Sequence, residues 1–319
     1  MNTLHITNGD CAVDLMQEAG VVGDILPWRD VLHEGPVPAD LELVELSEVR
    51  ARFIAERGWA SFDEALSQFQ ERDNKFSRFC EYAHVILWFE HDLYDQLQLI
   101  QILDWLGEQD RKDTCVSMIC TDKYLGWHTV EELKQLIGTE KPVISEQFDV
   151  ATQAWSAFRA VTPEKWYGLL KQDLSSLPFL SDAVLRQLQE LPAFNNGLSR
   201  TENQILSAID AGNHAPFDIF NFSQSEEKAV FMGDSSFWFY LAGLLEGTQP
   251  LLSLANGQRW AWPVDNSLEF SLTQTGMDVL HNKLHRLDDY ELDRWIGGVR
   301  LTADNMWYWQ ESTQTVINK

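Results

Sequence analysis

Hydrophobic and polar positions follow two distinct patterns over residues 1–146. An unbroken apolar run at 84–89 is typical of a β-strand covered on both faces, residues 114–120 are predicted to form another buried strand, and 3–7 and 23–28 are shorter β-prone runs. Amphipathic periodicity predicts helices over residues 11–18, 46–57, 62–80, 93–106 and 130–137. Because strands that alternate with helices pair in parallel through right-handed crossovers, we expect an α/β fold with a Rossmann-like, open and mainly parallel sheet.

Polar residues and glycines mark the ends of these elements. Asp10 and Asp92 each precede a helical stretch, and each is predicted to cap the helix N-terminus with a carboxylate oxygen. Gly20 is predicted to end the first helix in a left-handed conformation. One glycine and two prolines make residues 32–38 an irregular, semi-rigid loop, which is a candidate binding loop beside a strand end.

The pattern changes at residue 147. From there it predicts helices only, over residues 151–161, 163–171 and 181–191. We therefore expect a helical connector over residues 147–196. The Asn-Asn-Gly sequence at 195–197 is the strongest boundary signal in the chain. The Ser-Arg-Thr-Glu sequence at 199–202 fits a capping box, which would open the first helix of the next domain.

Residues 197–319 are expected to form a winged-helix-like α+β domain. Its further predicted elements are helices at 217–223, 234–247 and 275–284 and strands at 258–262, 269–273 and 299–302. This pattern commonly indicates DNA binding, but the helix at 234–247 carries no Lys or Arg, and acidic residues outnumber basic ones from residue 195 onward. Phosphate contacts need basic side chains. We therefore expect a structural or interaction module, with a protein as its partner.

Composition and charge narrow the class of protein. The 319 residues are 45% hydrophobic and 23% charged, as in folded globular proteins. The formal net charge of −25 argues against nucleic acid or an anionic membrane as the main partner. The four cysteines show no CxxC spacing and are expected to be reduced thiols. With no leader-like segment and no apolar run long enough to span a bilayer, we expect a soluble, cytoplasmic protein.

A polar cluster follows each of the four predicted strands of the first domain. The clusters are Asn8-Gly9-Asp10, Trp28-Arg29-Asp30, Glu90-His91-Asp92 and Thr121-Asp122. Ligands of open parallel sheets bind beyond the carboxyl ends of the strands, so we expect the clusters to converge on one crevice. The predicted catalytic residues are Asp10, Asp30, Glu34, Glu90, His91 and Asp92. The predicted substrate-binding residues are Asn8, Gly9, Trp28, His33, Gly35, Tyr94, Asp122 and Arg294.

The sequence leaves the cofactor open. The carboxylates that would offer hard oxygen ligands to Mg or Mn are those of Asp10, Asp30, Glu90 and Asp92. Histidines at 33 and 91 would instead favour a transition metal. Neither a GxGxxG fingerprint nor a P-loop follows the first strand, which argues against the NAD and ATP chemistry associated with those two motifs.

Crowding of charge singles out the segment after the third strand. Glu90, Asp92 and Asp95 place three acids around His91 within a few residues, and such crowding shifts pKa values or recruits a cation. Acid–base chemistry without a metal, by Glu34, His91 or Asp92, is the alternative.

Each candidate also has a simpler explanation. Asp10 and Asp92 would serve only as helix caps, and the charged loop that begins at Glu90 would face solvent. Arg294, which precedes Gly297 and Gly298, would form a surface ion pair; alternatively, its planar guanidinium would reach an anionic ligand.

Three motifs carry a resemblance to a known family. They are His5-Ile-Thr-Asn-Gly-Asp10, Trp28-Arg-Asp-Val-Leu-His-Glu-Gly-Pro36 and Trp88-Phe-Glu-His-Asp-Leu-Tyr-Asp-Gln96. In this order, over about residues 1–125, they resemble the bacterial family called domain of unknown function eighteen-thirty-five. Segments 197–202 and 293–298 resemble the C-terminal part of its longer members. The resemblance groups the motifs as a set and implies no activity. Cys11 departs from the pattern, where a Ser or another small residue is expected.

Two classes of function stay open. The first is an enzyme, a hydrolase or group transferase that acts on a small phosphorylated or nucleotide-like substrate with or without a divalent cation. The second is a non-catalytic ligand-sensing or protein-interaction factor. We favour the enzyme, and the two differ in one geometric expectation: the enzyme needs Asp10, Asp30, Glu90 and Asp92 to meet around a hollow.

Overall fold

The computed structural model describes residues 2–255 and 257–318, and the chain divides into two compact units. The helices that we expected to form a connector lie on both sides of this division. A short segment late in the sequence belongs to unit 1, and we call it the return segment. The division is as follows: unit 1 is Met1–Leu185 with the return segment Trp295–Val299, and unit 2 is Arg186–Arg294 with Arg300–Lys319.

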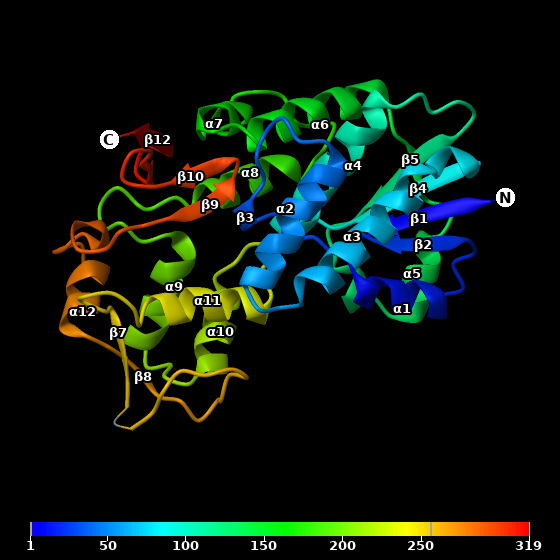
Figure 1. The fold of residues 1–319 in the computed structure, drawn as a ribbon. Coiled ribbons are helices and arrows are strands. Elements are labelled where there is room, and N and C mark those ends of the chain that lie inside the picture. The colour runs from blue at the N-terminus through cyan, green and yellow to red at the C-terminus, as the bar shows by residue number, and fades with distance from the viewer. Residues whose placement is uncertain (1, 256, 319) are drawn as a thin grey trace. The chain divides into compact units, whose positions relative to one another are not determined.

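Unit 1 is built on a five-stranded sheet with the strand order β2-β1-β4-β5-β6 (Figure 1). Its strands are β1 (Thr3–Thr7), β2 (Asp24–Pro27), β4 (His84–Phe89), β5 (Cys115–Cys120) and β6 (Lys141–Pro142). Neighbours among the first four pair in parallel, and only β6 runs antiparallel to its neighbour. The predicted α/β class and the mainly parallel sheet are therefore confirmed.

Helices cover both faces of this sheet. On one face, α1 (Asp10–Glu18) and α5 (Val130–Leu136) lie side by side. The other face carries α3 (Phe62–Ser77) and α4 (Leu93–Glu108). The remaining helices that lie wholly in unit 1 are α2 (Leu43–Glu56), α6 (Ser145–Phe158) and α7 (Glu164–Leu169), with short 3-10 turns η1 (Phe79–Glu81) and η2 (Leu125–Trp127).

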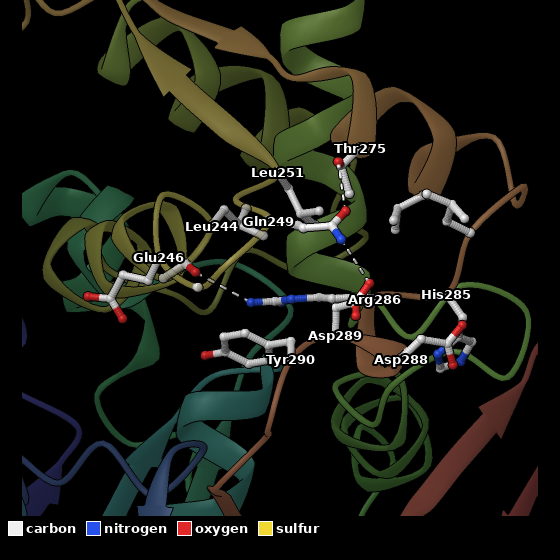
Figure 2. A pocket seen from close by; sticks show the side chains of 14 residues that line it. Leu244, Glu246, Gln249, Leu251, Thr275, His285, Arg286, Asp288, Asp289 and Tyr290 are labelled. Carbon is white, nitrogen blue, oxygen red and sulfur yellow. Dashed lines mark hydrogen bonds between the residues drawn. The ribbon is translucent and has the colours of Figure 1, made fainter.

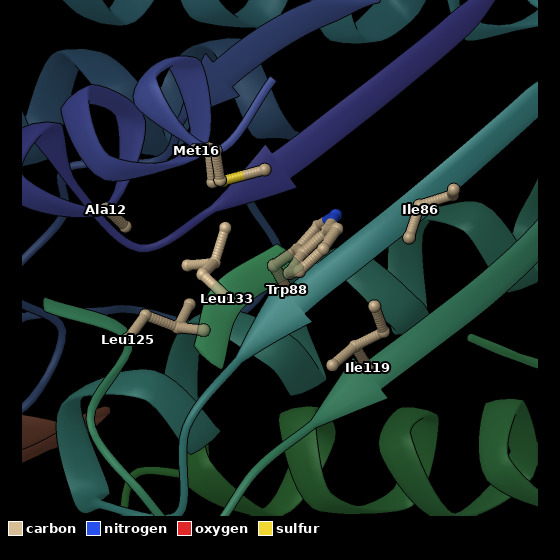
Figure 3. Close-up of a cluster of buried hydrophobic side chains, with 8 residues drawn as sticks. Ala12, Met16, Ile86, Trp88, Ile119, Leu125 and Leu133 are labelled. Carbon is tan, nitrogen blue, oxygen red and sulfur yellow. The ribbon is translucent and has the colours of Figure 1, made fainter. Parts of the chain in front are cut away.

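The alternation of side chains along β4 explains why both faces are covered. Ile86 and Trp88 point to one face and pack with Met16 of α1 and Leu133 of α5 in a fully apolar cluster (Figure 3). Their neighbours along the strand, such as Leu87, point to the opposite face because successive residues of a strand alternate. The unbroken apolar run of the sequence is thus explained by a strand buried between two helical layers.

The ends of α1 and α4 test the predicted helix caps. Asp92 is the N-cap of α4, and its side chain accepts a hydrogen bond from the backbone N–H of Asp95, as predicted. The prediction for Asp10 is wrong: Gly9 is the N-cap of α1, and Asp10 is the first helical residue. Gly20 has a φ of +79° directly after α1, as expected of a left-handed helix end.

The predicted irregular loop at 32–38 contains a short strand. β3 (Gly35–Pro36) pairs in parallel with β9 (Arg294–Gly297), through Ile296 and Gly297 of the return segment. The backbone N–H of Val37 also donates to the carbonyl of Gly297 at 2.8 Å. The return segment therefore completes unit 1 by pairing with a loop near the start of the chain.

Unit 2 contains helices, two small antiparallel hairpins and most of the C-terminal segment. Its elements are α9 (Arg200–Asp210), α10 (Pro216–Ser225), α11 (Asp234–Gly243), β7 (Leu252–Leu254), β8 (Phe270–Leu272), α12 (Gln274–Leu280), η3 (Arg286–Asp288), β11 (Trp307–Gln310) and β12 (Thr315–Asn318). Among the described residues three elements cross the division: α8 (Leu180–Leu188), β9 and β10 (Val299–Leu301). The predicted capping box at the start of α9 is confirmed, since the Ser199 and Glu202 side chains bond to each other's backbone N–H groups.

One predicted strand of unit 2 is wrong. Residues 258–262 form no strand, and the partner of β8 is instead β7, in which Leu252 is buried. Trp260 packs against the rings of Trp262 and Phe270, and Trp262 is 50% exposed. The aromatic residues at 258–262, which led us to predict a strand, instead make ring contacts from a loop.

Within the described part of the chain, no helix is both long and apolar enough to cross a membrane.

Candidate functional site

The strand order of unit 1 places a switch point between β1 and β4. From β1 the chain passes through α1 to β2 on one side, and it then returns across β1 to reach β4 on the other side. In open parallel sheets, ligands bind in the crevice at the carboxyl ends of the two strands where the order reverses. Asn8 and Gly9 follow β1, and Glu90 follows β4. These residues therefore lie where a site is expected.

Three carboxylates gather at this switch point, and we call them the acidic triad: Glu90, Asp92 and Asp95. One oxygen of each lies within 4.8 Å of the others, the only such group of His, Cys, Asp or Glu side chains found among the described residues. Their exposed fractions are 5%, 3% and 1%. Asn8, which follows β1, donates from Nδ2 to Oδ2 of Asp95 at 2.9 Å. The ends of β1 and β4 are thus joined through the triad.

Backbone N–H groups hold one oxygen of each triad residue. The N–H of Leu125 donates to Oε1 of Glu90 at 2.6 Å, and the N–H of Glu90 donates to Oδ1 of Asp95 at 2.7 Å. The N–H of Asp95 donates to Oδ1 of Asp92 at 3.2 Å. Because these donors lie in α4, in η2 and directly after β4, the fold itself fixes the positions of the carboxylates.

Burial and mutual repulsion disfavour three negative charges in this position. Burial, and then the charge of Glu90, raises the pKa of Asp92 to about 8. Burial raises the pKa of Glu90, and burial with the charges of Asp92 and Glu90 raises the pKa of Asp95 well above its usual value. Near neutral pH the triad must therefore hold protons or be neutralised by a cation.

His91 lies between two residues of the triad in the sequence and packs against aromatic rings. The imidazole of His91 lies 4.9 Å from the ring of Tyr124 and 5.9 Å from the ring of Phe179, measured between centroids. Gln96 donates from Nε2 to the carbonyl of Glu90 at 2.6 Å.

The N-terminus of α1 lies open beside the triad. Its N-cap, Gly9, supplies no side-chain cap, and a Cβ atom built on Gly9 would meet nothing within 4 Å. Asp10, which we predicted as catalytic, instead accepts hydrogen bonds from Arg29 at 2.9 Å and at 2.5 Å. These bonds lower the pKa of Asp10. The first N–H groups of α1 therefore lie beside an Arg29 guanidinium that is already paired with Asp10.

Asp30 does not join the triad. Nε of Arg50 donates to Oδ1 of Asp30 at 2.9 Å, and both side chains are fully buried. The same guanidinium donates to the carbonyls of Glu34, Pro36 and Val31. Asp30 and Arg50 therefore fix the loop after β2, and the predicted catalytic role of Asp30 has no geometric support.

The neighbouring loop residues are also engaged in packing. Glu34 pairs with Arg57 at 3.3 Å, and the His33 ring lies 6.0 Å from that of Tyr94. Gly35 has a φ of +76°, and a Cβ there would meet the Phe53 ring at 2.6 Å, so glycine is needed for packing.

Three further residues that we predicted to contact substrate are not members of the triad. Trp28 is fully buried and donates from Nε1 to Oε1 of Gln101 at 2.8 Å. Asp122 is exposed after β5. Arg294 belongs to unit 2, where it forms a buried ion pair with Glu202 at 3.3 Å instead of a surface pair. Burial alone would raise the pKa of Glu202, but nearby arginine charges hold it at about 2.

The four carboxylates that we expected to meet around one hollow do not all come together. Glu90 and Asp92 meet, whereas Asp10 and Asp30 each pair with an arginine. Asp95 was not among the predicted site residues, although the crowding of acids had included it. Its position three residues after the cap Asp92, on the first turn of a helix, is the signal that would have found it.

Two small cavities are unsuited to a substrate. One, of about 40 Å³ in unit 2, is lined by Leu251, Arg286 and Tyr290 and is crossed by the hydrogen bond from Arg286 to the Gly243 carbonyl (Figure 2). The other, of about 70 Å³, lies beside Phe69 in unit 1. Each has room for a few water molecules at most.

Comparison with known proteins adds little to this geometry. No protein-family model matches the sequence, and no curated protein matches it. Among solved structures, the chain is similar to the DNA-binding, cleavage and re-ligation domain of topoisomerase II from Plasmodium falciparum, with 14% sequence identity and a TM-score of 0.49. The match covers all of this chain and 54% of the topoisomerase II chain, so this chain spans about half the length of that one. A similarity this distant indicates neither function nor ligand.

Proposed function

We propose that unit 1 binds a divalent cation at the acidic triad and acts as a hydrolase or group transferase on a small phosphorylated substrate. The observation that carries the proposal is the position of three buried carboxylates at the switch point of a parallel sheet.

The donor set favours Mg²⁺ or Mn²⁺ over softer metals. Glu90, Asp92 and Asp95 offer carboxylate oxygens only, and hard cations prefer such ligands. A cation also removes the repulsion that burial imposes on the triad. Bound there, it would polarise a phosphoryl oxygen of the substrate.

The open N-terminus of α1 supports a phosphorylated substrate. Gly9 leaves space beside the first N–H groups of the helix, and Asn8 links this turn to the triad. Helix N-termini bind phosphate through these N–H groups and through the helix dipole. Arg29 lies at the same turn and offers a planar donor set, although Asp10 now engages it.

We also propose a fold type for each of the two units. We propose that unit 1 is Rossmann-like and that helices α9 to α11, followed by the β7–β8 hairpin, form a winged-helix-like module. The order of three helices, a hairpin and a further helix supports it. The family resemblance and the cytoplasmic location stay predictions.

The alternative is a non-catalytic sensing or interaction factor. Phe217 and Trp262 of unit 2 are 40% and 50% exposed, and exposed aromatic side chains are common at protein interfaces. This alternative would be favoured if the triad binds a cation without any turnover.

Cation binding is tested by Mn²⁺ titration of the whole chain at about pH 8, followed by electron paramagnetic resonance, which reports free and bound Mn²⁺ directly. We expect saturable binding that Asp95→Asn weakens by more than about tenfold, because the variant removes a ligand charge without changing shape. The control is Asp14→Asn, which changes an exposed carboxylate on α1 and should bind Mn²⁺ as the wild type does.

Catalysis is tested on the same three proteins with p-nitrophenyl phosphate. Product release should require Mn²⁺ or Mg²⁺ and should be lost in Asp95→Asn only. Absence of Mn²⁺ binding to the wild type, or equal binding by Asp95→Asn, would refute the cation site.

A further inference from the structure

Unit 2 contains a cavity that the proposed function does not use. Its volume is about 400 Å³, which lies in the range of cavities that bind small molecules. It is lined by the segment that precedes α9, by the first turns of α9 and by the end of β11. All of its lining residues belong to unit 2, whereas the residues of the acidic triad belong to unit 1.

Side-chain amides dominate the polar lining of this cavity. They come from Gln189, Asn195, Asn196, Asn203 and Gln204. An amide offers both donors and acceptors, as does a hydroxyl group, so the two kinds of group complement each other. The Gln204 amide is already bonded at both ends, to Glu227 and to Ser223, so a ligand with several hydroxyl groups would bond to the other four amides.

Apolar side chains form the back wall of the cavity. Leu191, Leu198 and Trp309 belong to it, and their exposed fractions of 1%, 1% and 3% leave little apolar surface for a ligand to contact. The accessible part of the lining comes mainly from polar residues, among them Asn195 and Asn203. Such a lining suits a ligand rich in hydroxyl groups better than it suits a purely apolar ligand.

The charges at the cavity disfavour an anion. Arg200 is its one cationic side chain, whereas Glu226 and Glu311 are both acidic. The Arg200 guanidinium also already donates to Oε1 of Gln189 at 3.1 Å and to the carbonyl of Glu226 at 2.8 Å. A phosphate or carboxylate ligand would meet more negative than positive charge.

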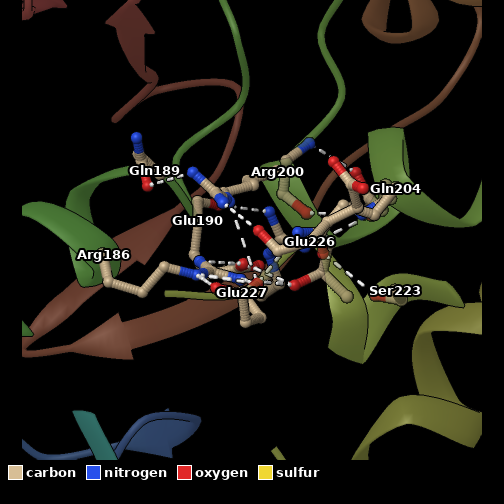
Figure 4. A network of polar contacts seen from close by, with 12 residues as sticks. Arg186, Gln189, Glu190, Arg200, Gln204, Ser223, Glu226 and Glu227 are labelled. Atoms are coloured by element: carbon tan, nitrogen blue, oxygen red, sulfur yellow. Dashed lines mark hydrogen bonds and ion pairs between the residues drawn. The ribbon is translucent and has the colours of Figure 1, made fainter. Parts of the chain in front are cut away.

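A buried ionic network holds the cavity lining in place (Figure 4). Arg186 donates to Glu190 at 2.7 Å and to Glu227 at 2.9 Å, and Glu227 in turn accepts from Nε2 of Gln204 at 2.9 Å. Ser223 donates to the other end of the Gln204 amide at 2.9 Å. A lining fixed in this way loses little conformational entropy when a ligand binds.

We propose that this cavity binds a neutral, hydroxyl-rich small molecule of the size of a mono- or disaccharide. The amides other than that of Gln204 supply the hydrogen bonds, and the acidic residues disfavour phosphorylated forms.

The test is saturation-transfer NMR on the full chain with glucose, galactose, N-acetylglucosamine and maltose, and with glucose 6-phosphate as the anionic counterpart. Calorimetry on any sugar that shows transfer gives its Kd. We expect at least one neutral sugar to bind and glucose 6-phosphate to bind at least tenfold more weakly.

Two variants locate the binding. Asn203→Leu removes one amide, and Asn203→Trp also fills the cavity; each should weaken binding at least tenfold. Asn221→Leu makes the same exchange at an exposed position of α10 and should bind as the wild type does. Melting temperatures confirm that each variant is folded. The proposal is overturned if none of the four neutral sugars binds, if the sugar phosphate binds better, or if both Asn203 variants retain wild-type affinity.

Discussion

The three carboxyl groups of the acidic triad have raised pKa values, so the stability of the fold should depend on pH. Asp92 has a pKa of about 8 in the folded chain, against a usual value of 3.8. Between these two values the folded state holds a proton that the unfolded state has released. Without a cation, the triad should therefore destabilise the fold as the pH rises through this interval.

We predict that Asp92→Asn is more stable than the wild type at about pH 8.5 in metal-free buffer and loses this advantage near pH 4. Asparagine caps a helix as well as aspartate does, so the start of α4 is preserved. Each kcal/mol gained should raise the melting temperature by about 2 to 4 °C. Melting curves over pH 4 to 9 measure this, with exposed Asp14→Asn as the control. Parallel pH profiles for Asp92→Asn and the wild type would contradict the shifted pKa.

Single residues show where prediction from sequence stops. Asp92 was correctly assigned as a cap because its partner lies three residues away. The partner of Asp30, by contrast, is Arg50, which lies two elements further along the chain. No feature of the sequence around Asp30 predicts that ion pair. Contacts within one helical turn are encoded locally, whereas ion pairs between elements depend on the fold.

At the scale of elements, the pattern of apolar residues located the four parallel strands of the central sheet but missed the two-residue strand β6. The strand at 84–89 was predicted to the residue, because burial on both faces leaves an unbroken apolar run with polar ends. Periodicity gave neither the order of the strands nor, therefore, the switch point. The two-residue strand β3 was missed because its partner, the return segment, lies far along the sequence.

The return segment provides a prediction at this scale. A Cβ on Gly298 would lie 2.0 Å from the carbonyl oxygen of Arg159, and the Gly298 N–H donates to the Phe158 carbonyl at 2.9 Å. Gly298→Ala should therefore displace the segment and cost about 1 to 3 kcal/mol, as overpacking does. Gly243→Ala, at the end of α11 where a Cβ meets nothing within 4 Å, is the control and should be neutral or stabilising. Denaturant unfolding measures both, and equal effects would contradict the packing argument.

At the scale of the whole molecule, charge is the dominant property. A net charge of −25 makes the folded chain repel itself, and the more expanded unfolded chain does so less. The buried pairs of unit 2, such as Arg186 with Glu190, are screened by salt far less than exposed charges are.

We therefore predict that the melting temperature at about pH 7.5 rises as NaCl increases from about 10 to 200 mM, because added salt shortens the range of the repulsion. Calorimetric scans measure the effect, and KCl at equal ionic strength should give the same rise. A melting temperature that falls with salt would indicate that attractive surface pairs outweigh the repulsion.

The return segment also bears on how the protein is made. A ribosome releases the chain from its N-terminus, and domains generally fold as they emerge. Here the sheet of unit 1 is synthesised early, but the strand that pairs with Gly35 and Pro36 emerges only after residues 186–294. The loop that contains Gly35 and Pro36 therefore lacks its strand partner until the return segment has been translated.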